Sequence, residues 1–220
     1  MQDPKVALQT LTNHWETWIT EDDFIAMQAA GLNHVRSVIH LSTSVIYPET
    51  LTLSSIPVGY WSVPLTPSDT NYTTSVAPYT PGAWPYLLQA VYWARNHSIR
   101  VIIDLHGAPG SQNGYDNSGQ RIPDPLWPIN PANVSRTLDV IKYISTHLGG
   151  MVDVIELLNE PAGFESNDFA DVVRQYWSDG YQAVRDTAGG GVKVMIGNAF
   201  LNFSVCICHN NNAIHLTEDC

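Results

Sequence analysis

Apolar residues recur along this chain in two kinds of spacing, and the two kinds alternate. The clearest helical spacing, three to four residues, belongs to Val134, Leu138, Ile141, Ile144 and Leu148. Gly149 and Gly150 follow and end this predicted helix. The continuous apolar run at residues 154–158 comes next, and such a run is typical of a strand buried on both faces of a sheet. One helix followed by one strand is therefore predicted here.

A similar pair is predicted near the beginning of the chain. Thr20 can cap a helix, because Asp23 lies at the position that faces the backbone N–H of the cap. This helix runs to about Ala30 and ends at Gly31, a residue that suits the turn after a helix. Residues 32–36 then form a short strand.

Two more pairs complete the pattern. Pro81 is expected to open a helix at its first turn, and the apolar face of that helix consists of Leu87, Leu88, Val91 and Tyr92. Residues 100–106 form the strand after it. A further helix is marked by Phe169, Val172, Val173, Tyr176, Trp177, Tyr181 and Val184, and a strand follows at residues 192–197.

Helices that alternate with apolar strands indicate an α/β fold with a parallel sheet. Polar residues follow each strand at its carboxyl end: Arg36, His106, Asn159 with Glu160, and Asn198. A (β/α)8 barrel, the TIM barrel, builds its site from residues at these ends. Only four pairs are found where a closed barrel needs eight, so the sequence predicts a partial barrel.

The charge of the chain narrows the function. The net charge is −11, from 10 Lys and Arg against 21 Asp and Glu, which excludes the basic surface that nucleic acid or an anionic membrane requires. No stretch is long and apolar enough to span a membrane, and residues 1–10 do not resemble a signal peptide. N-x-[ST] sequons at Asn71, Asn96, Asn133 and Asn202 favour secretion. The length fits one domain or part of one.

The sharpest chemical motif is Asn159-Glu160-Pro161, directly after a predicted strand. A carboxylic acid at a strand end can deliver a proton to a leaving oxygen, and the neighbouring carboxamide can bind a sugar hydroxyl. Glycoside hydrolysis needs such an acid together with a second carboxylate. The alternative is structural, with Glu160 as an anion at the start of a helix that Pro161 opens.

The second motif is the glycine-rich stretch from Asp104 to Gly119. It lacks both Gly-Lys-[Ser/Thr] and G-x-G-x-x-G, so it does not predict a phosphate site. His106 is either a structural histidine or a ligand-binding one, and Asp116 can orient an imidazole or bind hydroxyls. The glycines allow the backbone to approach a ligand closely.

Together the motifs resemble the fungal exo-β-1,3-glucanases (glucan 1,3-β-glucosidases) of glycoside hydrolase family 5. The segments that carry the resemblance cover most of residues 13–36 and 56–201: His14-Trp-Glu-Thr-Trp-Ile-Thr-Glu-Asp-Asp-Phe24, Gly31-Leu-Asn-His-Val-Arg36, Ile56-Pro-Val-Gly-Tyr-Trp61, residues 104–119 and Ile155-Glu-Leu-Leu-Asn-Glu-Pro161. The resemblance implies a retaining hydrolase with its acid/base on barrel strand four and its nucleophile on strand seven, and it places this chain at roughly strands two to five.

The resemblance also implies a role for each site residue. Glu160 is the acid/base, and Asn159 binds the 2-hydroxyl of the glucose in the first subsite. Arg36 supports the carboxylate of the nucleophile. The remaining positions line the pocket for the terminal glucose or its rim: His106, Asp116 and Tyr115. Trp61 and Trp127 are either sugar platforms or core residues.

Three departures from the family pattern stand out. The first strand of the family, with its site glutamate, has no counterpart before residue 13. Residues 37–55 interrupt a family sequence that is restored when Arg36 is joined to Ile56. Residues 202–220 form an unrelated tail after a catalytic part that spans 1–201. Both segments lack periodicity, and we interpret them as translated intron sequence.

The sequence predicts neither a metal site in the tail nor a second catalytic carboxylate. Zinc binding by Cys206, Cys208, His209, His215 and Cys220 is not expected, because the spacings match no standard zinc site. After Glu160 only Glu165 and Glu218 remain, and neither has the position of the nucleophile. The hypothesis is an extracellular or cell-wall β-glucan hydrolase without metal or cofactor, monomeric at full length and inactive as this chain. The rivals are a non-catalytic glucan-binding or regulatory fragment and a family 5 endo-β-glucanase of other linkage.

Overall fold

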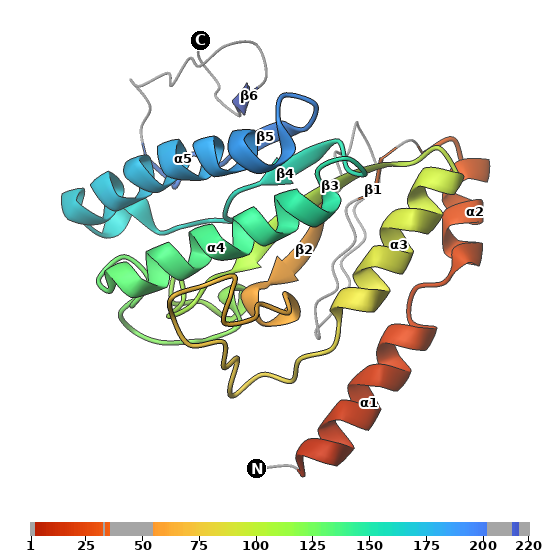
Figure 1. Cartoon of the computed structure of the whole chain (residues 1–220), viewed down its shortest axis with the longest axis horizontal. Coiled ribbons are helices and arrows are strands. Elements are labelled where there is room, and N and C mark those ends of the chain that lie inside the picture. Colours follow the sequence, from red (N-terminus) through yellow and green to blue (C-terminus); the bar gives the residue numbers. More distant parts are fainter. Residues whose placement is uncertain (1–2, 33, 36–54, 202–212, 216–220) are drawn as a thin grey trace.

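The computed structural model describes residues 3–32, 34–35, 55–201 and 213–215. In chain order its helices are α1 (Pro4–Thr17), α2 (Glu21–Ala29), α3 (Trp84–Asn96), α4 (Pro131–Leu148) and α5 (Asn167–Ala188), as Figure 1 shows. The strands are β1 (His34–Val35), β2 (Ser55–Gly59), β3 (Arg100–Gly107), β4 (Val154–Glu156), β5 (Lys193–Ile196) and β6 (Ala213–His215). Short 3-10 turns lie at η1 (Tyr60–Ser62), η2 (Asp116–Ser118) and η3 (Gly163–Glu165).

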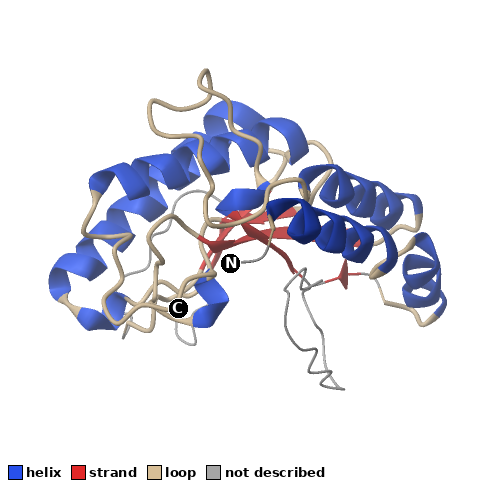
Figure 2. Cartoon of the chain, turned by 90° about the horizontal axis from the view of Figure 1, so that it is seen from below, coloured by secondary structure: helices blue, strands red, loops and turns tan. Residues whose placement is uncertain are grey.

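The strands form one parallel sheet in the order β1-β3-β4-β5-β6, with β2 also paired to β3. Figure 2 shows the helices in an arc along one side of the strands. Alternating helices and parallel strands with the helices outside are the arrangement of a (β/α)8 barrel. The predicted α/β fold, a partial barrel, is confirmed.

The two faces of the sheet bury different kinds of residue. Val101, Ile103 and Leu105 alternate along β3 and belong to the large core that includes apolar residues of α3, α4 and α5. Residues between them along the strand point to the opposite face. On that face Ile102 packs in a small separate cluster with Val154 and Met195. The carboxylates of Asp104 and Glu156 are buried on the same face, so this face combines a small apolar floor with polar groups.

The helix boundaries agree with the sequence at α2 and differ at α3. The carboxylate of Asp23 accepts a hydrogen bond from the backbone N–H of Thr20 at 2.8 Å, so the predicted cap is confirmed. The helix expected to open at Pro81 begins at Trp84 instead. Gly82 has φ +125°, which no residue within a right-handed helix can adopt, and this glycine delays the start of α3.

Helix α1 was not predicted, although its start carries a recognisable signal. The side chain of Asp3 accepts a hydrogen bond from the backbone N–H of Lys5, and Pro4 occupies the first turn.

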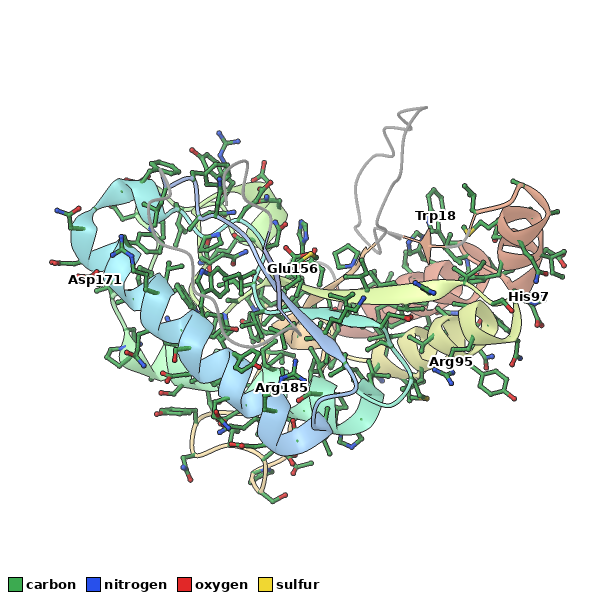
Figure 3. The ribbon with its side chains drawn as sticks, turned by 90° about the horizontal axis from the view of Figure 1, so that it is seen from above. Trp18, Arg95, His97, Glu156, Asp171 and Arg185 are labelled. Atoms are coloured by element: carbon green, nitrogen blue, oxygen red, sulfur yellow. The ribbon has the colours of Figure 1, made fainter. Side chains whose placement is uncertain are left out.

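Toward the other end of the chain, Arg185 joins α5 to the strand after it, and Figure 3 shows this residue near the carboxyl end of that helix. The guanidinium of Arg185 donates to the carbonyl of Val192 at 2.8 Å, directly before β5.

Strands β1 and β2 lie end to end along one edge of β3. In β1, Val35 is opposite Val101, and in β2, Ser55 is opposite Ile102. The two strands therefore occupy consecutive positions of a single strand, although residues 36–54 separate them in sequence. This is the edge at which the sequence predicts an insertion, and the pairing continues across it without a skipped or doubled position.

The tail contributes to the sheet at the opposite edge. Residues Ala213 to His215 of β6 pair in parallel with Val194 to Ile196 of β5. These three residues lie in the segment that the sequence analysis describes as a tail without periodicity, and they pair with β5 all the same, because backbone pairing requires no apolar periodicity in the partner. The cysteines of the tail and residues 37–54 of the predicted insertion lie outside the described residues.

Candidate active site

His106 and Asn159 meet at the carboxyl ends of β3 and β4. The side-chain nitrogen of Asn159 lies 3.4 Å from Nε2 of His106, and the backbone N–H of Asn159 donates to the carbonyl of Leu105 at 2.9 Å. Asn159 is only 4% exposed, so its carboxamide is held within the site and does not reach into solvent. The structure thus brings together two residues that are far apart in sequence and that were both predicted to bind the sugar.

A carboxylate on β3 orients the imidazole. Nδ1 of His106 lies 2.6 Å from Oδ2 of Asp104, whose side chain is fully buried. An imidazole nitrogen that faces an acceptor carries the proton, so Nδ1–H donates to Asp104 and Nε2 faces the amide of Asn159. Asp116 was expected to be able to orient an imidazole, and Asp104, two residues before His106 on the same face of the strand, does so instead.

Glu160 follows directly on this group and projects into solvent. Glu160 is exposed, and the Oε2 atom of its carboxylate accepts a hydrogen bond from the side-chain nitrogen of Asn117 at 2.7 Å. Its backbone has φ +46°, a left-handed conformation that a residue with a side chain adopts at a cost in free energy. The strand ends at Glu156, so this left-handed residue turns the chain away from the sheet and the carboxyl group toward the segment after β3.

The fully buried Gln112 ties the two strand ends to each other. Its side-chain nitrogen donates to the carbonyl of His106 at 2.8 Å and to the carbonyl of Asn159 at 2.9 Å. Its side-chain oxygen accepts from the backbone N–H of Ala108, and its backbone carbonyl accepts from the N–H of Ala162. Gln112 was not predicted, because its partners are backbone groups that a sequence motif does not reveal.

The other predicted pocket residues lie on the outer part of the same segment. The carboxylate of Asp116 is 77% exposed and lies 3.7 Å from the guanidinium of Arg121. The ring of Tyr115 is 59% exposed, as a residue at a rim would be. Arg36 lies outside the described residues. The structure therefore brings together Glu160, Asn159 and His106, and it leaves Asp116 and Tyr115 at the surface beside them.

Trp61 supports this segment from the side of β2. A Cβ atom on Gly59, Gly107 or Gly119 would lie within 3.0 Å of the Trp61 ring, so the indole rests directly on three stretches of backbone. The ring stacks on Tyr79 with centroids 4.0 Å apart, and the hydroxyl of Tyr79 donates to the carbonyl of Gly119 at 3.0 Å. Trp61 is therefore a support of the segment that carries Asp116. Trp127 is a core residue, because it is fully buried.

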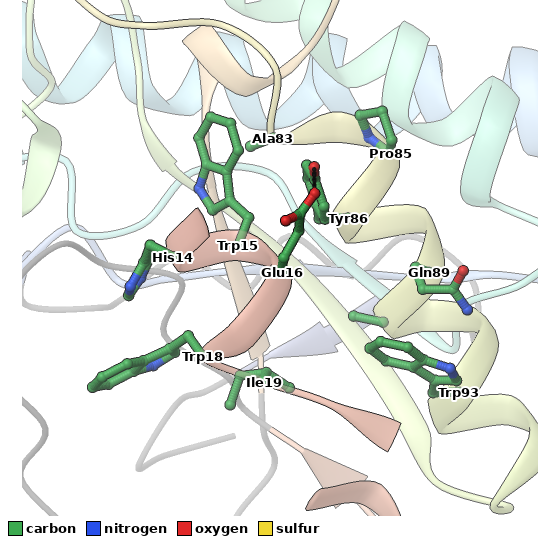
Figure 4. Close-up of a pocket in the computed structure, with 11 residues that line it drawn as sticks. His14, Trp15, Glu16, Trp18, Ile19, Ala83, Pro85, Tyr86, Gln89 and Trp93 are labelled. Atoms are coloured by element: carbon green, nitrogen blue, oxygen red, sulfur yellow. Dashed lines mark hydrogen bonds between the residues drawn. The ribbon is translucent and has the colours of Figure 1, made fainter. Parts of the chain in front are cut away.

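A cleft of about 400 Å³ lies elsewhere, between α1 and α3 (Figure 4). Aromatic rings dominate its lining, which includes Trp15, Trp18, Tyr86 and Trp93. The hydroxyl of Tyr86 donates to the carboxylate of Glu16 at 3.2 Å across it. None of the predicted site residues that the structure describes lines this cleft, so it is separate from His106, Asn159 and Glu160 at the strand ends.

Within the described residues, no group of three or more His, Cys, Asp or Glu side chains could hold a metal ion. The same part of the chain has no helix that is long and apolar enough to cross a membrane.

Comparison with known proteins identifies the family. The model of the cellulase family, glycosyl hydrolase family 5, matches residues 2–213. The chain belongs to glycosyl hydrolase family 5. A glucan 1,3-beta-glucosidase of Blumeria graminis is 40% identical over 199 residues, and glucan 1,3-beta-glucosidase 2 of Wickerhamomyces anomalus is 40% identical over 200 residues. Each alignment covers 89% of this chain and 39% of the relative, so this family 5 chain spans about two fifths of the length of these relatives.

Solved structures support the fold. The crystal structure of AoRut superposes with a TM-score of 0.65 at 19% identity, covering 86% of this chain and 49% of that one. The rutinosidase of Aspergillus niger superposes with a TM-score of 0.61 at 18% identity, covering 82% of this chain and 48% of that one. At these identities the likeness concerns the fold alone. In both cases the family 5 chain matches about half of the other structure, as expected for part of a barrel.

Proposed function

We propose that this chain is the acid/base part of a glucan 1,3-β-glucosidase that releases glucose from β-1,3-glucan with retention of configuration. The observation that carries the proposal is Glu160, which follows β4 with a hydrogen-bonded carboxylate beside the Asn159–His106–Asp104 group. The identity of about 40% to glucan 1,3-beta-glucosidases supports β-1,3-glucan as the substrate.

Each residue then has a distinct task. Glu160 protonates the glucosidic oxygen as the bond breaks and later takes a proton from the attacking water. Asn159 binds the 2-hydroxyl of the reacting glucose, and the hydrogen bond that its amide makes to His106 fixes the direction in which the carboxamide points. His106 and Asp116 line the pocket of the terminal glucose, with Tyr115 at its mouth and Arg36 supporting the nucleophile.

The 220-residue chain on its own is proposed to be inactive on β-1,3-glucan. The retaining mechanism requires two carboxyl groups about 5–5.5 Å apart. Glu165, the next glutamate after Glu160, lies on η3 only a few residues further along and is exposed, so it does not provide the opposing group. Glucose release from laminarin by the purified chain is the measurement, and clear release that Glu160→Gln abolishes would contradict the proposal.

Residues 37–55 are proposed to be an insertion into a single strand. The pairing on β3 leaves one position between Val35 and Ile56, the position opposite Ile102. Ser55 fills this position in the present chain. If residues 37–55 were removed, Arg36 would fill it, and the strand would run without a break on the face of the sheet that holds Asp104.

The proposed location is extracellular, supported by the sequons. Asn71 and Asn96 are exposed and accessible to a glycan. Asn133 is not, because its side-chain nitrogen donates to the carbonyl of Leu126 and packs against Gly110. Expression in a secreting host should therefore add glycans at Asn71 and Asn96 but not at Asn133, and mass spectrometry of the glycopeptides tests this.

A chimera tests the activity itself. Residues 56–201 of this chain would replace the matching segment of the Blumeria graminis relative, which supplies the remaining strands. The proposal predicts that the chimera releases glucose from laminarin as its first product. Release of oligosaccharides would indicate an endo-acting glucanase. A folded chimera that binds laminarin without hydrolysing it would indicate a non-catalytic glucan-binding role for this segment.

A further inference from the structure

Carboxamide side chains from the segment after β3 contact consecutive groups of the segment after β4. Gln112 donates to the carbonyl of Asn159 at 2.9 Å, and Asn113 donates to the carbonyl of Glu160 at 3.1 Å. Asn117 donates to the carboxylate of Glu160 at 2.7 Å. The two segments are more than 40 residues apart in sequence, so these bonds fix the position of Glu160 relative to β3.

Asn113 also determines which way the carboxamide of Asn117 points. The side-chain nitrogen of Asn113 lies 3.1 Å from the side-chain oxygen of Asn117 and donates to it. The side-chain oxygen of Asn113 is occupied by the backbone N–H of Tyr115 at 2.9 Å. Because Asn113 is 5% exposed and bonded at both ends, it cannot turn, and the Asn117 nitrogen is left directed at Glu160.

An amide suits this position better than an ionisable group. It donates to a carboxylate but neither gives up nor takes a proton at ordinary pH, so it holds Glu160 without competing for the proton that the reaction transfers. The bond is made to Oε2, so in the proposed mechanism Oε1 is the oxygen that protonates the glucosidic oxygen. Glu160 is exposed, so packing around its side chain does not fix the orientation of the carboxyl group.

We propose that Asn117 is a positioning residue that holds the carboxyl group of Glu160 in one rotamer, and that Asn113 sets the direction of the Asn117 amide. The catalytic meaning of this contact rests on the proposed function, because it concerns the acid/base residue. The contact itself does not depend on turnover, so it can be tested on the 220-residue chain whether or not the chain hydrolyses glucan.

The test measures the side-chain rotamers of Glu160 by nuclear magnetic resonance. Three-bond couplings about χ1 and χ2 of Glu160 are recorded in the unaltered chain, in Asn117→Leu and in Asn117→Asp, which keeps the shape of the side chain but loses its N–H donor. Asn96→Leu, at the end of α3, is the matched control. Wild type and the control are expected to show couplings of a single rotamer, and both Asn117 variants should show averaged couplings with the backbone spectrum otherwise retained.

Two results would overturn the proposal. One is a wild-type chain in which Glu160 already shows averaged couplings, and the other is an Asn117→Asp chain in which the single rotamer persists. A further reading comes from the Asn117 amide protons, whose resonances should move in Glu160→Ala and remain in place in Glu165→Ala. If the chimera with the Blumeria graminis relative failed to hydrolyse laminarin while the couplings of Glu160 stayed those of a single rotamer, the result would count against the proposed function and leave the positioning role standing.

Discussion

Strand β3 has two very different neighbours. On one side β4 and β5 continue the sheet as unbroken strands, each preceded by a long helix, and Asn159 and Glu160 follow the carboxyl end of β4. On the other side the neighbouring strand is divided into β1 and β2. Both sides nevertheless keep a parallel register with β3. The difference shows that the register with β3 is kept even where residues 36–54 separate two consecutive positions of the neighbouring strand.

The unbroken side also explains why the site can form in a partial barrel. Strand β4 pairs with β3 along one edge and with β5 along the other. The main core lies between these three strands and the helices. The contacts of His106, Gln112 and Glu160 lie within this block and between it and the segment after β3. The divided side supplies Trp61, which supports that segment, and the position that Ser55 now fills.

The largest expected effect is on the unbroken side. Ile155 in β4 is fully buried in the main core, so Ile155→Ala should lower the free energy of unfolding by about 2–5 kcal/mol. Chemical denaturation followed by circular dichroism measures the loss. Ile25→Ala, at an exposed position of α2, is the control and should change the free energy of unfolding by less than about 0.5 kcal/mol. Equal effects at the two positions would contradict the account of the core.

The next prediction concerns the divided side. Deletion of residues 37–55 shortens the connection between β1 and β2 and should stabilise the chain by about 2–3 kcal/mol, because the two ends of that connection no longer have to be brought together on folding. Deletion of residues 37–54 is the matched control. It leaves one residue too many between Val35 and Ile56, and a shift of one residue turns side chains to the wrong face. Equal stability of the two deletions in thermal unfolding would show that the register is not continuous.

A smaller effect is expected where the two sides meet. Gly119 has φ +86°, and a Cβ atom there would lie 2.3 Å from the Trp61 ring. Gly119→Ala should therefore cost about 1–3 kcal/mol and change the fluorescence of Trp61. Gly150→Ala is the control, because nothing lies within 4 Å of a Cβ atom at that position. A fluorescence spectrum unchanged by Gly119→Ala would place Trp61 away from this backbone.

The smallest effect is a loss of stability at alkaline pH, and it concerns Tyr79, whose ring stacks on Trp61. Burial raises the pKa of Tyr79 from 10.0 to about 12, with a smaller contribution from Tyr60. A raised pKa favours the neutral, hydrogen-bonding form, so its contribution is complete below pH 10 and is lost as pH rises through about 12. The stability difference between wild type and Tyr79→Phe should narrow over that range in denaturation experiments.

Tyr92→Phe, on an exposed ring of α3, is the control for that measurement. A difference between wild type and Tyr79→Phe that stays constant from pH 9 to pH 12 would mean that the Tyr79 hydroxyl is not shielded from solvent as the structure indicates.

The sequence predicts the unbroken side well, for a physical reason. Strands buried on both faces appear as continuous apolar runs, and residues 100–106 and 154–158 show this pattern directly. Glu160 and His106 follow from the same pattern, because site residues of a parallel sheet lie at the ends of such runs. Asp104 could also have been found, since residues two apart on a strand share a face and a buried carboxylate requires a partner.

The remaining features had no comparable signal. Gln112, Asn113 and Asn117 are amides in a glycine-rich segment, and their partners after β4 are two backbone carbonyls and the carboxylate of Glu160. Strand β6 was missed because residues 213–215 have the composition of a tail, and their strand character comes from the edge of β5 that they pair with. The start of α3 was misplaced because one glycine with a positive φ outweighed the preference of Pro81.

The most direct measurement of the central claim uses Glu160→Gln in the chimera with the Blumeria graminis relative, with Glu165→Gln as the matched control. The rates are compared for laminarin and for an aryl β-glucoside with an activated leaving group. If Glu160 is the proton donor, the rate on laminarin should fall by about 10²–10⁴-fold, while the first step on the activated substrate should fall far less because its leaving group needs no proton. Equal losses on both substrates would contradict the assignment of Glu160 as the acid.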